Sequence, residues 1–153
     1  MKLIDEVLGI LDYLIDKDYY KHSINIIKRH EGFSSKEYKD IYGNPTIGYG
    51  RNLNNGITIP EAELMLLNDI NNSIKDLKSI FNNFDELPDN IKIVLIDMMY
   101  NLGINRFKTF KKMIKAINDN NWLDMIYEMK DSKWCKQLNN RCKENIELIK
   151  EIL

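Results

Sequence analysis

The chain carries EGFSSKEYKDIYGNPTIGYG at residues 31–50, and this stretch decides how the rest of the sequence is interpreted. Short β-prone pieces such as Thr46-Ile47, and Ile57-Thr58 further on, lie among residues that favour turns. Those turn residues are Gly43, Asn44, Pro45, Gly48, Gly50, Asn54, Asn55 and Gly56. The pattern predicts a small antiparallel sheet within about residues 33–58.

Two helix boundaries flank this sheet. Upstream, Ser23 is placed to cap a short helix that ends at about Glu31, where Gly32 stops it. Downstream, Thr58 and Glu61 have the spacing of a capping box at the start of a helix over about residues 59–81. The small sheet therefore lies between two helices, the second of them long.

Helical periodicity continues to the end of the chain. The stretch from Ile91 to Leu102 is densely apolar and predicts the core of a helical lobe over about residues 88–153. Further helices are expected around residues 107–117, 122–129 and 142–152, with Gly103 at a break. We therefore predict an α+β protein, mainly α, in which a small sheet lobe and a larger helical lobe are joined by the long helix.

Composition limits the function classes. With 153 residues, 22 basic and 23 acidic side chains, the chain has a net charge of −1 and no basic stripe, so nucleic-acid binding is not expected. Acids interrupt every apolar run of residues 1–20, so this segment is read as an amphipathic helical extension rather than a signal peptide or membrane anchor. We expect synthesis in the cytoplasm.

The two cysteines and two histidines do not suggest a metal site. Cys135 and Cys142 are seven residues apart, while His22 and His30 lie far from them in sequence. We expect two reduced, partly buried thiols, with a disulfide as an open alternative.

Two carboxylates are candidates for general acid–base chemistry. Hydrolysis of a glycosidic bond needs a protonated acid and an ionised carboxylate in different environments. Glu31 would lie at a helix C-terminus, where the helix dipole disfavours a negative charge, and burial would add to that effect. Asp40 falls in a wetter, turn-rich loop, where the Thr46 hydroxyl is near enough to hold a water. Spacing alone leaves open that these are simply a helix-end Glu and a surface Asp.

The residue types and spacings together are more specific. Glu31-Gly32, Tyr38-Lys39-Asp40 and Thr46-Ile47-Gly48-Tyr49-Gly50 resemble the active-site signature of the phage-type lysozymes, and weaker similarity extends over about residues 23–150. The resemblance implies a lysozyme-like fold over residues 21–153 and cleavage of the β-1,4 bond between N-acetylmuramic acid and N-acetylglucosamine in peptidoglycan. It implies Glu31 as general acid, Asp40 as the group that positions or activates water, Thr46 as its helper, inversion of the anomeric centre, and no cofactor or metal.

The resemblance also implies substrate-binding residues. It places Asn52, Tyr100 and Arg141 at the substrate, with Arg141 paired to Glu31, and it suggests an Arg51–Asp69 ion pair. Phe110 and Glu128 stand at sugar-contact positions, although their residue types depart from the family pattern. Tyr100 fits equally well as an aromatic side chain at the edge of the core.

Three alternatives stay open on the sequence. The chain could be a lysin released at host lysis, a virion-associated or secreted antibacterial effector, or a non-catalytic module that binds peptidoglycan or protein. We expect a monomer. Residues 1–20 have no counterpart in the family pattern, and we expect their Leu3–Ile15 helix to pack on the helical lobe, or else to dock a partner or a membrane surface. The resemblance also implies that the protein reaches the cell wall through a separate pore or secretion machine.

Overall fold

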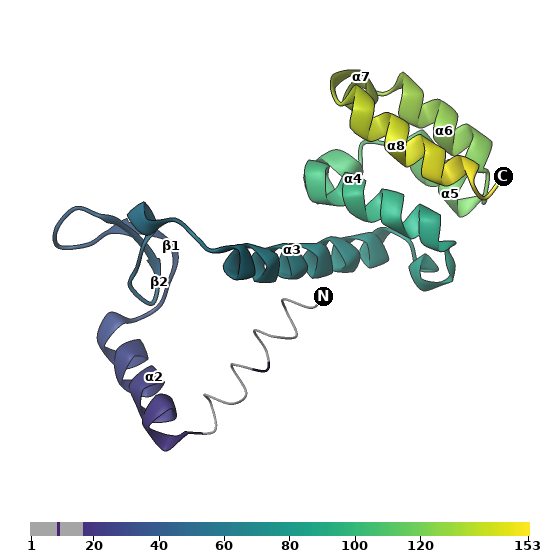
Figure 1. Cartoon of the computed structure of the whole chain (residues 1–153). Helices are drawn as coiled ribbons and strands as arrows, with labels where there is room; N and C mark the ends of the chain where they lie inside the picture. Colours follow the sequence, from purple (N-terminus) through teal and green to yellow (C-terminus); the bar gives the residue numbers. More distant parts are fainter. Residues whose placement is uncertain (1–8, 10–16) are drawn as a thin grey trace. The chain divides into compact units, whose positions relative to one another are not determined.

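The structure, a computed structural model, describes Gly9 and residues 17–153 (Figure 1). The chain divides into two compact units, Met1–Leu66 and Leu67–Leu153, which are treated separately here. The helix expected over Leu3–Ile15 lies outside the described residues apart from Gly9. Within the part of the chain that is described, no helix is long and apolar enough to cross a bilayer.

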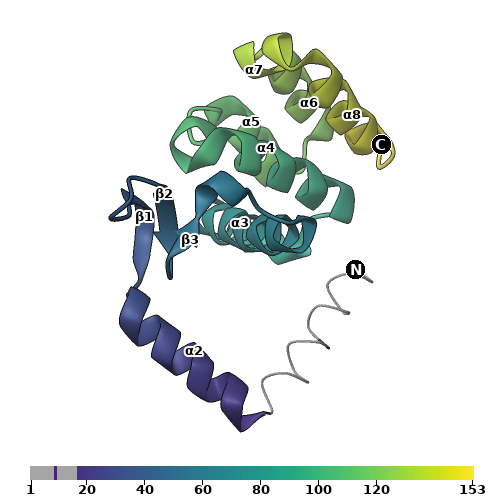
Figure 2. The ribbon, with the colours of Figure 1, turned by 60° about the vertical axis from the view of Figure 1, so that its left-hand side comes forward.

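The first unit is built on a helix and a three-stranded sheet. Helix α2 (Asp18–Glu31) leads into β1 (Ser34–Lys39), β2 (Pro45–Gly48) and β3 (Arg51–Asn52), and a short 3₁₀ helix, η1 (Leu53–Asn55), follows. The strands are antiparallel in the order β1-β2-β3, as Figure 2 shows. Tyr38 pairs with Thr46 across the first pair of strands, and Thr46 pairs with Asn52 across the second. The predicted small antiparallel sheet is therefore confirmed.

Two boundaries in this unit differ from the sequence prediction. Helix α2 begins at Asp18, because the Tyr20 and Lys21 amides already donate to the Lys17 carbonyl, so Ser23 is an interior residue and not a cap. Ile57-Thr58 is not a strand. The Thr58 backbone N–H donates to Oε2 of Glu61 (2.7 Å), which commits it to the start of the next helix instead of a strand ladder.

The long helix α3 (Ile59–Ile80) begins with the predicted capping box. The Glu61 carboxylate accepts from the Thr58 backbone, and the Glu61 N–H donates back to Oγ1 of Thr58 (3.4 Å). Its apolar stripe is buried only toward its C-terminus: Leu66 and Leu67 are exposed, whereas Leu77 is fully buried in the core of the second unit. The last turns of α3 therefore belong to that core.

The second unit is helical and contains the hydrophobic core of the described chain. Figure 1 shows α5 to α8 gathered around α4. The elements are η2 (Phe84–Glu86), α4 (Asp89–Phe107), α5 (Lys111–Asn118), α6 (Trp122–Asp131), α7 (Lys133–Gln137) and α8 (Asn139–Lys150). Of the predicted core helix, Ile91, Val94, Leu95, Met98 and Met99 are buried and Leu102 packs against them. The mainly helical α+β fold is confirmed.

Two details of this unit separate prediction from structure. The expected break at Gly103 is present, since its φ of 71° and ψ of 161° interrupt the helical backbone inside α4. The short helix α7 was not predicted. It begins where the Ser132 hydroxyl accepts the Cys135 backbone N–H (3.1 Å). With five residues, α7 is too short to show helical periodicity in the sequence.

The expectation of two reduced thiols is wrong. Cys135 and Cys142 form a disulfide, with their Cα atoms 5.1 Å apart. The reason is local: α7 and α8 are joined at Leu138, and this sharp junction folds a separation of seven residues back to bonding distance. Cys142 is fully buried in the core, so the bond ties α7 to the centre of the second unit.

Candidate active site

Glu31 is the last residue of α2, as the sequence predicted. Gly32 ends the helix with a φ of 68°, a left-handed conformation that glycine adopts without steric cost, and its N–H donates to the Lys28 carbonyl (3.1 Å). Glu31 is exposed, so the first unit does not supply the burial that was expected for this carboxyl group. Its position at the carboxyl end of a helix is the expected feature that is present.

The Glu31 side chain reaches the turn between β2 and β3. A Cβ atom built on Gly50 would stand 2.5 Å from Oε2 of Glu31 and 2.9 Å from its carboxyl carbon. Gly50 also has a φ of 79°. The glycine at this position therefore has two physical reasons: it turns the chain between the strands, and it leaves room for the carboxyl group of Glu31.

Asp40 lies at the tip of the β1–β2 hairpin and is held by backbone and side-chain donors. Its Oδ1 accepts from the backbone N–H of Tyr42 (2.9 Å) and of Asn44 (2.8 Å), and its Oδ2 accepts from Nδ2 of Asn44 (3.1 Å). The Asn44 side chain, followed by the Asn44 backbone, holds the pKa of Asp40 below its ordinary value. The group is therefore an ionised carboxylate at neutral pH, as its expected role requires.

Thr46 is the central residue of this small sheet. It is buried, and its hydroxyl donates to the backbone carbonyl of Asn44 (3.1 Å). A hydroxyl has one proton and two acceptor lone pairs, so toward any further group Thr46 acts as an acceptor. Asn44 therefore contacts both Asp40 and Thr46, and the sequence analysis did not assign it a role. The signal that pointed to it was its place within the Gly-Asn-Pro turn that begins three residues after Asp40.

Glu31 and Asp40 flank strand β2 at its two ends. Asp40 is bonded to Asn44, immediately before the strand, and Glu31 lies against Gly50, just beyond it. The first unit thus brings both candidate carboxylates to one strand.

Asn52 pairs with Thr46 in the sheet, but its side chain is used locally. Its Oδ1 accepts the backbone N–H of Asn54 (2.9 Å) and so caps η1. The side chain of Asn52 therefore stabilises η1 beside the candidate site, and its expected contact with sugar stays a prediction.

The ion pair expected between Arg51 and Asp69 is not formed. Arg51 instead contacts Glu61, with 3.2 Å between Nη1 and Oε1, and donates to the carbonyl of Gly56 (3.1 Å). The capping box draws the Glu61 carboxylate back to Thr58 at the end of α3, within reach of Arg51. Asp69 lies eight residues beyond Glu61 on α3, which is about 12 Å further along the helix axis at 1.5 Å per residue.

Arg141 pairs with Asp97 inside the second unit, a partner that the sequence did not predict, and its expected pairing with Glu31 stays a prediction. Its Nε donates to Oδ2 of Asp97 (2.9 Å) and its Nη2 to Oδ1 (2.6 Å). Asn145 adds a hydrogen bond to Oδ2 (2.8 Å). Burial of Asp97 raises its pKa, but the bonds from Arg141 and Asn145 outweigh that effect and the pKa stays below its ordinary value. The forked geometry of the guanidinium matches this carboxylate.

Tyr100 lies one turn beyond Asp97 on α4 and is exposed. The hydrogen bonds to Asp97 raise the pKa of Arg141, although partial burial opposes them. The ring of Tyr100 is half-exposed and free to make an outside contact.

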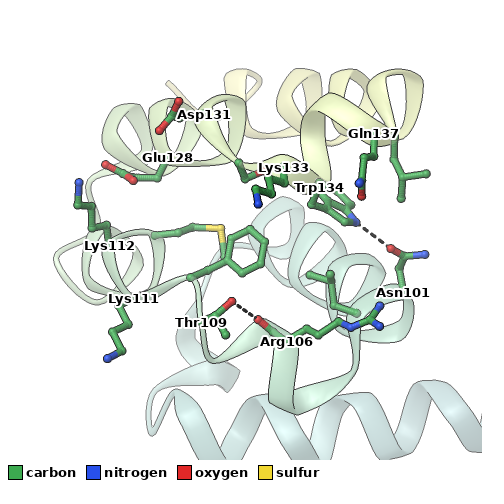
Figure 3. Close-up of a pocket in the computed structure, with 15 residues that line it drawn as sticks. Asn101, Arg106, Thr109, Lys111, Lys112, Glu128, Asp131, Lys133, Trp134 and Gln137 are labelled. Carbon is green, nitrogen blue, oxygen red and sulfur yellow. Dashed lines mark hydrogen bonds between the residues drawn. The ribbon is translucent and has the colours of Figure 1, made fainter.

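The second unit also holds a cavity of about 920 Å³ between the end of α4 and helices α5, α6 and α7 (Figure 3). Nε1 of Trp134 donates to Oδ1 of Asn101 (2.8 Å) at one wall. Phe110 and Glu128, the two positions at which the family pattern implied sugar contact, both line it. Its charged lining comprises Arg106, Lys111, Lys112, Glu128, Asp131 and Lys133.

Among the residues that the structure describes, no group of three His, Cys, Asp or Glu side chains is arranged to hold a metal ion. The chemistry of the first unit is that of two carboxylates, a hydroxyl and an amide.

Comparison with known proteins assigns the family. A model of the family described as phage lysozyme matches residues 28–147. Two proteins of Dictyostelium discoideum are similar. "Probable T4-type lysozyme 2" is 28% identical over 76% of this chain and 86% of its own length. "Probable T4-type lysozyme 1" is 27% identical over 82% of this chain and 91% of its own length. Since the family match spans most of the sequence and includes both carboxylates, the chain belongs to the phage lysozyme family, a family of lysozyme-type peptidoglycan hydrolases.

Proposed function

We propose that this chain is a muramidase that hydrolyses the β-1,4 bond between N-acetylmuramic acid and N-acetylglucosamine in bacterial peptidoglycan. The observation that carries the proposal is the pair of carboxylates flanking β2, one at a helix end against Gly50 and one ionised at the hairpin tip. Two carboxyl groups in different environments are what glycoside hydrolysis requires.

In the proposed reaction, Glu31 is the general acid. Its carboxyl proton passes to the bridging oxygen as that oxygen leaves with the N-acetylglucosamine residue. A water oxygen bonds to the anomeric carbon of N-acetylmuramic acid, and Asp40 accepts the proton that the water loses. Attack from the face opposite the leaving group inverts the anomeric centre.

Thr46 orients this water in the proposal. Because its own proton is donated to the Asn44 carbonyl, its oxygen accepts a hydrogen bond from the water. The second water hydrogen then points to Asp40, which leaves the oxygen lone pair for the anomeric carbon. The two acceptors would thus fix the direction of attack before the bond breaks.

We assign the outer contacts with the glycan to Asn52, Tyr100 and Arg141. The exposed ring of Tyr100 is suited to pack on a sugar face, and the cavity lined by Phe110 and Glu128 offers room for a further part of the wall polymer. Lysis of bacterial cells by this activity, after export of the protein through a separate pore or secretion machine, is part of the same proposal.

The test is the chemistry of the fragments released from purified peptidoglycan. Products are reduced with borohydride and examined by mass spectrometry, and we expect new reducing ends on N-acetylmuramic acid. Reducing ends on N-acetylglucosamine, or cleaved peptides, would refute the assignment of the bond.

A pair of matched variants tests the roles. Glu31→Gln is expected to abolish release of fragments while the circular dichroism spectrum is unchanged, because the amide has no proton to give. Glu37→Gln, an exposed position on β1, removes the same charge from the same unit and is expected to retain activity. Equal activity of both variants would contradict the role of Glu31.

A further inference from the structure

Asn44 holds both oxygens of the Asp40 carboxylate. Its backbone N–H donates to Oδ1 (2.8 Å) and its side-chain Nδ2 donates to Oδ2 (3.1 Å). The Asp40 backbone N–H donates in return to the Asn44 carbonyl (3.0 Å), and that carbonyl also accepts from Thr46 (3.1 Å). A carboxylate held through both oxygens cannot rotate about its last bond without losing a charge-assisted hydrogen bond.

Asn54 holds the far end of the Asn44 amide. An ionised carboxylate only accepts hydrogen bonds, so Asp40 faces the NH₂ group of Asn44 and leaves the amide oxygen on the other side. Nδ2 of Asn54 donates to that oxygen (3.3 Å) and so ties the amide in place. Asn54 is itself fixed in η1, where Asn52 caps its backbone N–H. A chain of hydrogen bonds thus runs from η1 to the hairpin tip.

We propose that Asn44 is the positioning residue of the active site: it sets the rotation of the Asp40 carboxylate, and Asn54 holds the Asn44 side chain in place. This inference rests on the proposed function for its catalytic meaning. The hydrogen bond from the Asn44 side chain also favours the charged form of Asp40, in agreement with the lowered pKa of that group.

Asn44→Ala is the direct test, because it removes the side-chain bonds and leaves the backbone bonds in place. On soluble peptidoglycan fragments we expect kcat to fall about tenfold, the effect of losing one hydrogen bond to a charged group, with little change in KM. The acid limb of the kcat profile is expected to move to higher pH, because Asp40 loses a donor to its charged form. A purely structural role for Asn44 would lower the fraction of folded protein without moving this limb.

Asn54→Ala is the second variant, and Asn55→Ala is its control. Asn54→Ala keeps the bond from Asn44 to Asp40 but removes the bond that holds the Asn44 amide from its other end, so we expect a smaller loss of kcat and a shift of the acid limb in the same direction. Asn55 lies beside Asn54 in η1, and its side chain makes no hydrogen bond to the described residues. Asn55→Ala should therefore behave as the wild type.

NMR titration of the Asp40 carboxyl carbon separates this inference from the proposed function. In Asn44→Ala the titration is expected to move to higher pH whether or not the protein cleaves peptidoglycan. If wild-type protein releases no fragments, the proposed function fails and the titration still reports on Asn44. An unchanged Asp40 titration in folded Asn44→Ala, or a kcat and acid limb equal to those of the wild type, would overturn the inference.

Discussion

Breaking the Cys135–Cys142 disulfide should destabilise the second unit by an amount that its loop length predicts. The bond closes a loop with a sequence separation of 7. In the chain-entropy model, a loop of that size contributes about 2.5 kcal/mol, chiefly by limiting the conformations of the unfolded chain. For a protein of this length such a loss corresponds to a fall in melting temperature of about 5–10 °C.

Cys135→Ser is the better substitution for this experiment. Cys135 is partly exposed, whereas Cys142 is fully buried and a hydroxyl placed there would add its own cost. Urea unfolding of the oxidised wild type, the reduced wild type and Cys135→Ser gives the comparison. We expect the last two to unfold at the same, lower midpoint, and reductant to leave Cys135→Ser unchanged. Equal midpoints for the oxidised and reduced wild type would refute the argument.

Two further predictions concern single contacts. Gly50→Ala should lower hydrolysis strongly, because its Cβ would meet Oε2 of Glu31 at 2.5 Å and displace that carboxyl; unchanged turnover in a steady-state assay would contradict this. Asp97→Asn should lower the free energy of unfolding at neutral pH by about 1–3 kcal/mol, since Arg141 loses its carboxylate. The pKa of Asp97 is lowered by folding, so its contribution is present above the ordinary Asp pKa and lost as pH falls through the folded value. The difference between wild type and Asp97→Asn in denaturant unfolding should therefore narrow in acid, and a constant difference would argue against the assignment.

Local signals in the sequence predicted most elements of the fold. Gly32 ends α2 where expected, and Thr58 with Glu61 begins α3 as a capping box. In each case the residues that decide the boundary lie within four positions of one another, so no knowledge of distant packing is required. The apolar spacing from Ile91 to Leu102 located the core helix for a similar reason, because burial of one helix face repeats within each turn.

The errors arose where several partners were available. Arg51 has carboxylates at Glu61 and Asp69 within one helix, and the capping box at Thr58 decides between them. Whether Cys135 forms a disulfide depends on how α7 meets α8, and α7, with five residues, is too short to be predicted from helical periodicity. Neither the ion-pair partner of Arg51 nor the disulfide of Cys135 can be predicted from residue types at a fixed spacing.

Arg141 shows why a contact between residues far apart in the sequence is harder to predict than a contact within a hairpin. Asp40, Asn44 and Thr46 lie within seven residues, so the turn that joins them also fixes their hydrogen bonds. Arg141 is 44 residues from Asp97, and their pairing depends on how α8 packs on α4. Asn145 lies one turn beyond Arg141 on α8 and bonds to the same carboxylate, so this helix register supplies two donors to Asp97. A guanidinium that is bound to Asp97 in this way and is drawn to a second carboxylate must share its donors or give up bonds it already has. The strength with which Arg141 contacts any substrate or acid is therefore set by Asp97 and Asn145, two residues that no active-site motif includes.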